Sequence, residues 1–418
     1  MRPWYNPDRL TKPIEHGVLK LQSRYVVVFG ASLTQFTVIG LLFSYGIFFS
    51  EFETEFGWSR TLLSSCSSLA FLMMGVLAMV GGRLSDRFGP RLVLAVSGIL
   101  YGVGYALISQ VNEPWQLFLI FGTLIGIGLS THDVVTLSTI GRWFERRRGV
   151  MTGVIKVGTA MGQVAAPPVA AVLILSFGWR NALIVLGLSA IVLLLVAAVA
   201  MKNPPVKAGQ ATADMHIGQT FQEARNSRLF WTICAIQFLF FPSLMTVPLH
   251  LAIHGKDLGM TAAQAASLLS VIGAASIVGR LAIGSLVDKI GGRNAYAICF
   301  LFLITSLIGL MYIAGHWPLF VIIAFYGFAH GGFFTVVSPT IAKYFGMRAH
   351  GAIFGTVLFF GTIGGSIAPI LTGLVFDTVG SYQLAFLGLT MLAVTGLLLV
   401  LTLPRVANVD DQVASDLA

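Results

Sequence analysis

The feature that most constrains this chain is a succession of twelve apolar segments, each roughly 20 residues or longer. A helix of that length crosses the hydrocarbon core of a bilayer, which is about 30 Å thick. Hydrophobic residues make up 56% of the 418 residues and charged residues only 10%, a balance that water-soluble globular domains do not show. The sequence therefore predicts an all-α integral membrane protein with twelve transmembrane helices, embedded in a lipid bilayer.

A polar segment between two apolar ones, residues 82–91, recurs at residues 284–293. The two copies read GRLSDRFGPR and GSLVDKIGGR, so Gly, Leu, Asp, Gly and Arg keep their order and spacing at a shift of 202 residues. That shift is close to half of the chain, and an internal repeat decides the architecture before local structure is considered. The same shift relates glycines elsewhere, for example Gly178 and Gly380. We therefore predict two six-helix bundles related by duplication.

One long polar stretch, residues 202–227, contains Pro204-Pro205 and is typical of a linker between the bundles. The segment before the first span lacks the apolar core of a removable signal peptide. Duplicated halves with a site between them suit transport by alternating access. We predict an arm on the membrane surface at residues 1–24 and a first bundle at residues 25–201. A linker at residues 202–227 leads to a second bundle at residues 228–402 and a polar tail at residues 403–418.

The positive charges are concentrated on one side of the predicted membrane. With the N-terminus inside the cell, 21 of the 26 Lys and Arg residues fall in cytoplasmic segments. This asymmetry follows the positive-inside rule and predicts that both termini are cytoplasmic. It also accounts for the net charge of +9 without a nucleic-acid partner. We expect a multi-pass protein of the plasma membrane.

Three fixed charges are predicted to lie inside the spans, at Asp133, Lys156 and Arg280. A charge at bilayer depth is costly and is by default a functional hypothesis. Asp133 and Lys156 belong to adjacent antiparallel spans, so we expect a direct ion pair, with either a structural role or a role in proton or substrate coupling. Arg280 has no acidic partner in the spans of its own half, and its planar guanidinium matches a carboxylate bidentately. We therefore predict that Arg280 is the anion site; the alternative is a gate residue that faces the interface between the bundles.

Several polar side chains are candidates to assist these charges. Ser276 lies one turn before Arg280 on the same helix face and is expected to donate a second hydrogen bond to the substrate. Histidine changes its charge near physiological pH, so His250 and His330 are candidate substrate ligands and His132 is a candidate for proton coupling. The alternative for each histidine is a role in helix packing.

The repeated loop is a candidate gate, formed by Asp86, Arg91, Asp288 and Arg293. A carboxylate at this place is expected to cap a helix N-terminus or to pair with an arginine across the interface between the bundles. Such contacts would hold one access state and be released in the other. The alternative is that the basic residues of the loop only determine topology.

Over all twelve segments the chain resembles the major facilitator superfamily, whose signature is the loop at residues 82–91. Residues 45–58 and 143–162 are similar to the monocarboxylate porter branch, which includes proton-linked lactate and pyruvate transporters and resembles oxalate and formate exchangers. In these proteins an arginine in the eighth span binds the substrate carboxylate, and SIVGR at residues 276–280 matches that place. Animal members also have an acid one turn earlier and a lysine in the first span, where this chain has Ser276 and Phe43. The resemblance therefore names no proton-coupling residue.

Together these observations predict a secondary transporter of small monocarboxylates, such as lactate- or pyruvate-like acids, coupled to H+. Two alternatives stay open: exchange or efflux of another organic anion, including dicarboxylates and amphipathic drugs, and a non-transporting membrane sensor. The sequence contains no HExxH, no Walker loop and no nucleophile elbow, and its histidines lack metal-ligand spacing. We therefore expect neither an enzyme nor a metal or cofactor site.

Overall fold

The computed structural model describes residues 8–145, 147–204, 218–312 and 315–405. Every regular element in these ranges is helical, apart from a single β-bridge between Gly218 and Gly346. The elements are, in chain order, α1 (Asp8–Ser44), η1 (Tyr45–Phe48), α2 (Phe49–Phe56), α3 (Arg60–Phe88), α4 (Pro90–Ile108), α5 (Pro114–Ile120), η2 (Phe121–Ile125), α6 (Gly126–Trp143), α7 (Arg148–Ala200), α8 (Phe221–Arg225), α9 (Arg228–Asp257), α10 (Ala262–Tyr312), α11 (His316–Phe345), α12 (His350–Val379) and α13 (Gln383–Thr402).

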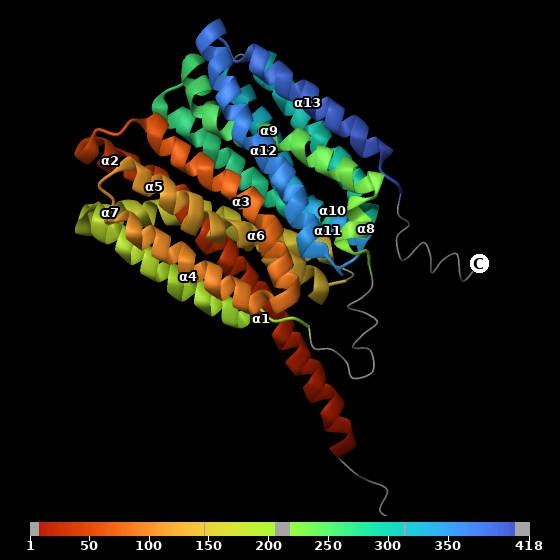
Figure 1. The fold of residues 1–418 in the computed structure, drawn as a ribbon. Coiled ribbons are helices and arrows are strands. Elements are labelled where there is room, and N and C mark those ends of the chain that lie inside the picture. Colours follow the sequence, from red (N-terminus) through yellow and green to blue (C-terminus); the bar gives the residue numbers. More distant parts are fainter. Residues whose placement is uncertain (1–7, 146, 205–217, 313–314, 406–418) are drawn as a thin grey trace, which may run out of the picture.

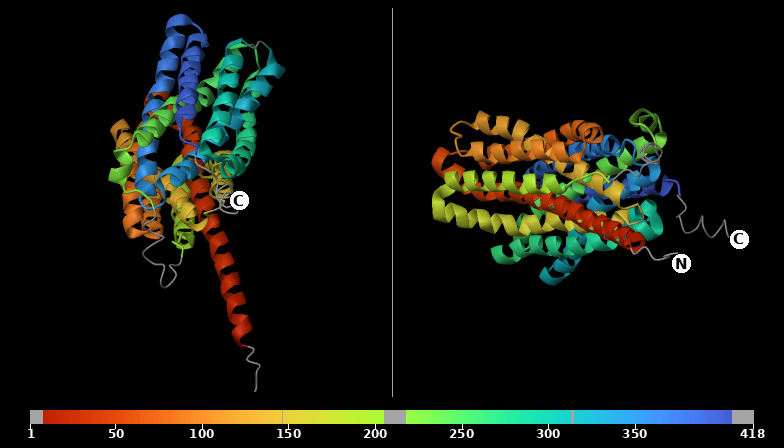
Figure 2. Two further views of the ribbon diagram at one scale, coloured as in Figure 1. Left: turned by 90° about the vertical axis from the view of Figure 1, so that its right-hand side faces the viewer. Right: turned by 90° about the horizontal axis from the view of Figure 1, so that it is seen from below.

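Ten helical segments of the described chain are long and apolar enough to cross a membrane. Two of them are interrupted by one glycine each, α7 at Gly178 (φ 75°) and α10 at Gly291 (φ 81°). Glycine adopts this left-handed conformation without steric cost, so the chain turns back at each break, as α7 does in Figure 2. The described residues therefore form twelve antiparallel spans, and the predicted all-α membrane fold is confirmed.

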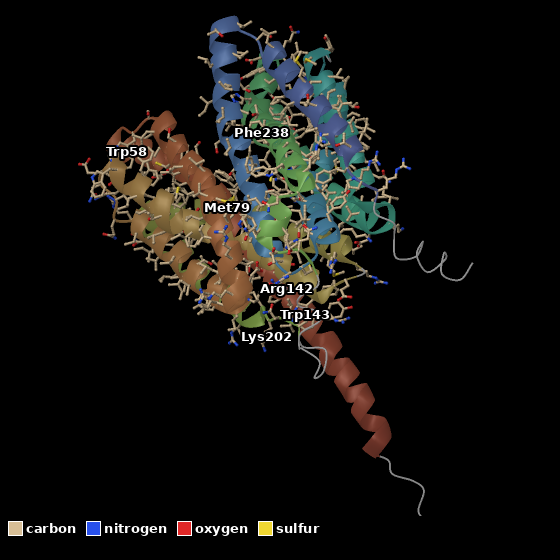
Figure 3. All side chains as sticks on the ribbon, turned by 45° about the vertical axis from the view of Figure 1, so that its right-hand side comes forward. Trp58, Met79, Arg142, Trp143, Lys202 and Phe238 are labelled. Carbon is tan, nitrogen blue, oxygen red and sulfur yellow. The ribbon has the colours of Figure 1, made fainter. Side chains whose placement is uncertain are left out.

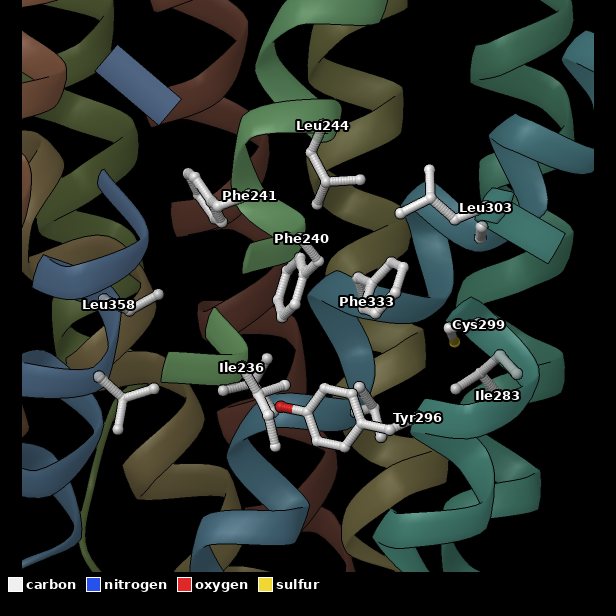
Figure 4. Packing of buried hydrophobic residues seen from close by; sticks show 14 of the residues in the cluster. Ile236, Phe240, Phe241, Leu244, Ile283, Tyr296, Cys299, Leu303, Phe333 and Leu358 are labelled. Carbon is white, nitrogen blue, oxygen red and sulfur yellow. The ribbon is translucent and has the colours of Figure 1, made fainter. Parts of the chain in front are cut away.

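The helices gather into two halves that follow the sequence. In Figure 1, the red to yellow-green helices α1 to α7 lie on one side and the green to blue helices α9 to α13 on the other. Aromatic rings fill much of the second half: Phe240 stacks on Phe333 with ring centroids 4.2 Å apart (Figure 4). A separate buried cluster lies wholly within the first half, between Val38 and Leu194. The cluster around Phe240 and Phe333, by contrast, extends across both halves and includes Val134 and Ile155 of the first half.

The N-terminal segment differs from the sequence-based expectation. Residues 8–24 do not turn aside as a separate arm but continue the first span as one helix that projects beyond the bundle (Figure 1). Residues 18–29 contain neither glycine nor proline, so nothing there breaks the helix. At its other end α1 stops at Ser44, and the chain continues through η1 into the short helix α2, which Gly57 ends at φ 68°. The remaining parts of the predicted arm, linker and tail, residues 1–7, 205–217 and 406–418, lie outside the described residues.

Candidate functional site

Two spans of the first half bring its intramembrane charges together. Asp133 on α6 and Lys156 on α7 form an ion pair, and both residues are buried. The contact expected from neighbouring antiparallel spans is therefore present. Nearly every residue of α6 is buried, and the helix follows a π-helical turn, η2, a distortion that often occurs at functional sites.

Gln35 on α1 connects this pair to its surroundings, although it is not among the site residues predicted from the sequence. Its Nε2 donates to Asp133 Oδ1 at 2.8 Å and lies 3.0 Å from Thr136 Oγ1. Its Oε1 accepts a hydrogen bond from Thr159 Oγ1 at 2.8 Å. Both ends of the amide are therefore satisfied inside the first half. The available signal was that Gln35 is the lone amide side chain of the first span.

Arg280 on α10 is the charge that the second half contributes, and only 1% of it is exposed. Its Nη1 donates to Ser276 Oγ at 3.3 Å, while its Nε has no hydrogen-bond partner among the described residues. Helix α7 approaches so closely that a Cβ atom at Gly153 would lie 2.4 Å from the Arg280 carbonyl oxygen. The charge of Asp133 attracts the guanidinium across this contact, and Lys156 and Arg280 repel each other. The three charges thus form one central cluster with an excess of one positive charge.

Ser276 supports Arg280 in a way that differs from the expectation. We expected its hydroxyl to donate a hydrogen bond to the substrate. In the structure the hydroxyl donates to the carbonyl oxygen of Gly273 at 2.8 Å and accepts from Arg280. Serine in a helix commonly bonds a carbonyl of the preceding turn. In this state Ser276 therefore orients the guanidinium and has no proton left for a ligand.

His330 on α11 belongs to the central cluster. It is 8% exposed, its Nδ1 has no hydrogen-bond partner among the described residues, and it lies within the electrostatic reach of Arg280. Its ring is 5.1 Å from the ring of Phe334, and Lys156 Nζ lies 5.5 Å from the centroid of the same ring. Phe334 therefore links the histidine of the second half to the lysine of the first.

The two other predicted histidines have different surroundings. His132 Nε2 lies 3.5 Å from Asp133 Oδ1, so this ring flanks the ion pair. His250 on α9 lies 3.3 Å from the Tyr382 hydroxyl and 3.2 Å from the carbonyl oxygen of Pro369, both in the second half. Within the described residues the structure gives His250 no hydrogen bond to the central cluster.

The two repeated loops meet the opposite half at one end of the molecule, which we call the loop end. Asp288 accepts hydrogen bonds from the backbone N–H groups of Gly149 and Val150, at the start of α7, at 2.8 and 2.9 Å. Asp86 likewise accepts from backbone N–H groups at the start of α12. A carboxylate is favoured there because the first N–H groups of a helix lack partners and carry the positive end of the helix dipole. Each loop thus caps a helix of the other half.

Glycines allow the halves to touch backbone to backbone at the loop end. A Cβ atom at Gly82 would lie 2.2 Å from the carbonyl oxygen of Gly351, and one at Gly284 would lie 2.4 Å from that of Gly149. These distances are too short for any side chain, and backbone atoms cannot yield as a flexible side chain does. The interface is therefore closed at the loop end.

The arginines of the candidate gate do not form the pair across the interface that we considered. Arg293 Nη2 donates to the carbonyl oxygen of Leu401 at 2.7 Å, within its own half, and Arg91 is exposed. The arginine that pairs with Asp86, at 2.5 Å, is Arg142 at the end of α6. Figure 3 shows Arg142 beside Trp143 at the loop end. Arg142 lies outside the repeated loop, so the gate predicted from the sequence does not include it.

Comparison with known proteins places the chain in a family. The model of the Major Facilitator Superfamily matches residues 31–317 and 254–415. Monocarboxylate transporter 13 of Bos taurus is 30% identical over 394 residues, which cover 91% of this chain and 89% of that protein. Monocarboxylate transporter 12 of Mus musculus is 25% identical over 398 residues, which cover 87% of this chain and 82% of that protein.

Solved structures share the fold at low sequence identity. The proton:xylose symporter XylE, bound to 6-bromo-6-deoxy-D-glucose, superposes with a TM-score of 0.73 at 15% identity, covering 91% of this chain and 95% of that one. The transporter FucP in the outward conformation gives a TM-score of 0.70 at 16% identity, covering 92% and 100%. With the family model and the relatives, these matches show that the chain is a multi-pass membrane protein of the Major Facilitator Superfamily, a family of transporters and not of enzymes, and that it is related to the monocarboxylate transporters.

Proposed function

We propose that this protein carries small monocarboxylates of the lactate and pyruvate type across the plasma membrane, together with a proton, by alternating access. The observation that carries the proposal is the excess of one positive charge at the buried centre. Asp133 balances Lys156, whereas Arg280 makes its only hydrogen bond in the described structure to a neutral serine. An uncompensated buried charge is strongly unfavourable. One substrate carboxylate supplies the missing negative charge.

The guanidinium of Arg280 offers the geometry that a carboxylate requires. Nη1 is held by Ser276, while Nε is left without a partner among the described residues. Nε and a neighbouring Nη form the fork that binds both oxygens of one carboxylate. A dicarboxylate would need a second free cation, and Lys156, the other buried cation of the cluster, is already paired with Asp133. This arrangement favours a monocarboxylate over the dicarboxylate alternative.

The gate gives the alternating-access part of the proposal its structural basis. The structure is closed at the loop end, which the positive-inside rule predicts to be cytoplasmic. Opening to the cytoplasm would require both caps, at Asp86 and Asp288, to leave the helices of the opposite half together. Rocking of the two halves about the central cluster would achieve this while Arg280 keeps the substrate between them.

For the proton we propose a route through the residues around Asp133. This carboxylate contacts Lys156, Gln35 and His132, so its protonation would release Lys156 from the ion pair and change the charge of the whole cluster. His132 and His330 are the further candidates to exchange the proton. Uptake driven by a pH gradient, with Asp133→Asn as the variant, tests this route: gradient-driven accumulation should be lost while exchange of lactate across the membrane continues.

Uptake of radiolabelled lactate into proteoliposomes tests the substrate assignment. Arg280→Ala should reduce uptake at least about a hundredfold, because a charged hydrogen-bond donor is lost from a buried site. Arg280→Lys should give intermediate uptake, since the charge is kept without the planar fork. Arg405→Ala, which removes an exposed arginine, is the matched control and should transport normally. Normal uptake by Arg280→Ala would remove the basis of the proposal.

A further inference from the structure

The internal repeat places a second glutamine, Gln237 on α9, at the position that Gln35 occupies on α1, 202 residues earlier. The correspondence also holds for contacts. In the first half Thr131 Oγ1 donates to Ser97 Oγ, and in the second half Gly332 packs against Cys299, at the corresponding positions. Ser97 and Cys299 are 202 residues apart in the sequence. Between α6 and α11 the shift is 201 residues, which relates Thr131 to Gly332 and Trp143 to Tyr344. The repeat therefore assigns counterparts residue by residue around the centre.

The two glutamines have opposite surroundings. Gln35 bonds to Asp133, Thr136 and Thr159. The counterparts of these three residues in the second half have no polar side-chain atom, being Phe334, Val337 and Gly361.

Gln237 is therefore a buried amide whose expected partners are missing. It is 1% exposed, and its Oε1 has no hydrogen-bond partner among the described residues. Buried polar groups are nearly always hydrogen-bonded, and an unsatisfied acceptor costs free energy. A partner that does not belong to the protein would remove that cost.

The position of Gln237 points to the central cluster as the source of this partner. A Cβ atom at Gly361 would lie 2.9 Å from Gln237 Cγ, so the amide occupies the space that a side chain on α12 would fill. One turn further along α9, Phe241 contacts Phe334 with ring centroids 5.9 Å apart. Phe334 is the ring that lies next to Lys156 and His330. Gln237 thus borders the cluster from the side of the second half.

We propose that Gln237 is a specificity-determining residue whose Oε1 accepts a hydrogen bond from the 2-hydroxyl group of the acid bound at Arg280. The inference rests on the proposed function and narrows it to 2-hydroxy monocarboxylates. A hydroxyl group donates to the amide oxygen, whereas a 2-oxo group presents a second acceptor and a methylene group donates nothing. A site built to bond a hydroxyl discriminates strongly against analogues that lack one.

Lactate, pyruvate and propionate test the proposal, because these three-carbon acids differ only at the second carbon. Their dissociation constants are measured as competitors of lactate uptake in proteoliposomes and by ligand-induced thermal shift in detergent. The wild-type protein should bind lactate at least about tenfold more tightly than pyruvate or propionate. In Gln237→Met, which keeps the shape of the side chain, the three constants should lie within about twofold of one another.

A second variant tests the same hydrogen bond by giving Gln237 a partner within the protein. A Cβ atom at position 361 would crowd Gln237 Cγ, so Gly361→Ser shifts the amide and offers it a hydroxyl, as Thr159 does for Gln35. This variant should abolish the preference for lactate although Gln237 is still present. Gln237→Met should not lower the unfolding temperature, because the Oε1 acceptor that it removes has no partner among the described residues. A structural role for Gln237 predicts the opposite.

The outcomes separate this inference from the proposed function. If no acid binds, or if binding survives in Arg280→Ala, the proposed function fails and the inference fails with it. If binding depends on Arg280 but the preference for lactate is absent in the wild type or persists in Gln237→Met, only the inference is overturned.

Discussion

The two halves of the molecule are alike at the loop end and different at the centre. At the loop end, Asp86 and Asp288 cap opposite helices, and both helix contacts rely on glycine. At the centre the first half provides Asp133 and Lys156, where the second half has Phe334 and Leu358. The second half in turn provides Arg280, whose counterpart in the first half is Ala78.

This difference matches the two tasks of a transporter. A gate that opens and closes by rocking two bundles needs equivalent contacts on both sides of the interface, so a symmetric pair of caps serves it well. A small organic acid has a carboxylate at one end only, so its site gains nothing from symmetry. The duplicated loop therefore indicates how the halves move, whereas the unmatched residues indicate what they hold.

The largest expected effect tests the asymmetry at the centre. Lys156→Leu gives the first half the residue type found at position 358 and leaves Asp133 as a buried carboxylate without its cation. We expect a loss of about 3–5 kcal/mol in the free energy of unfolding, because breaking one side of a buried pair is strongly destabilising. The change is measured by thermal unfolding in detergent.

A double variant distinguishes the charge effect from a loss of packing. Asp133→Asn combined with Lys156→Leu removes both charges and should recover most of the lost stability. Equal instability of the single and double variants would show that the pair contributes through shape and not through charge.

Much of the fold follows from local sequence, because membrane burial imposes it residue by residue. Segment length and hydropathy predict the spans, and the glycines that the repeat relates, such as Gly178 and Gly380, adopt positive φ as turns between spans require. The exception is the segment before the first span, which continues that span as one helix although it contains Pro13 and Gly17.

The site is predicted less completely, because its contacts join spans that are distant in sequence. The pair of Asp133 and Lys156 is foreseeable because its spans are consecutive and antiparallel. Gln35 lies 98 residues from Asp133, and nothing local indicates that its amide reaches that carboxylate. Charge alone likewise cannot show that Asp86 pairs with Arg142 in its own half while capping a helix of the other.

A smaller effect is expected from variants that test whether the two glycine contacts of the gate are equivalent. Gly284→Ala would place a methyl group 2.4 Å from the carbonyl oxygen of Gly149, so the halves must separate at the loop end. We expect the closed state to lose about 1–3 kcal/mol, as other overpacked contacts do. Opening is measured by maleimide labelling of a cysteine placed at Ala352, a buried residue of the same interface, since Cys66, Cys234 and Cys299 are buried.

A matched pair of variants shows whether the effect belongs to the gate. Gly82→Ala, the repeat counterpart, should accelerate labelling to a similar extent. Gly388→Ala on α13, where nothing lies within 4 Å of the added methyl group, should leave the labelling rate unchanged. Acceleration by Gly284→Ala without acceleration by Gly82→Ala would show that the two contacts are not equivalent.

The smallest expected effect sharpens the comparison between the two caps, which differ in their electrostatics. Asp288→Asn keeps an acceptor for the N–H groups of α7 and loses the charge at the helix dipole, so we expect the closed state to lose about 0.5–1 kcal/mol. Asp86→Asn loses the same interaction and also leaves Arg142 without its carboxylate, so labelling at position 352 should accelerate more in Asp86→Asn. When Arg142→Gln is added to Asp86→Asn, the labelling rate should fall to that of Asp288→Asn. In both proteins the only interaction lost is then the one between the carboxylate charge and the helix dipole. Faster labelling in Asp288→Asn than in Asp86→Asn would mean that Arg142 opposes closure instead of supporting it.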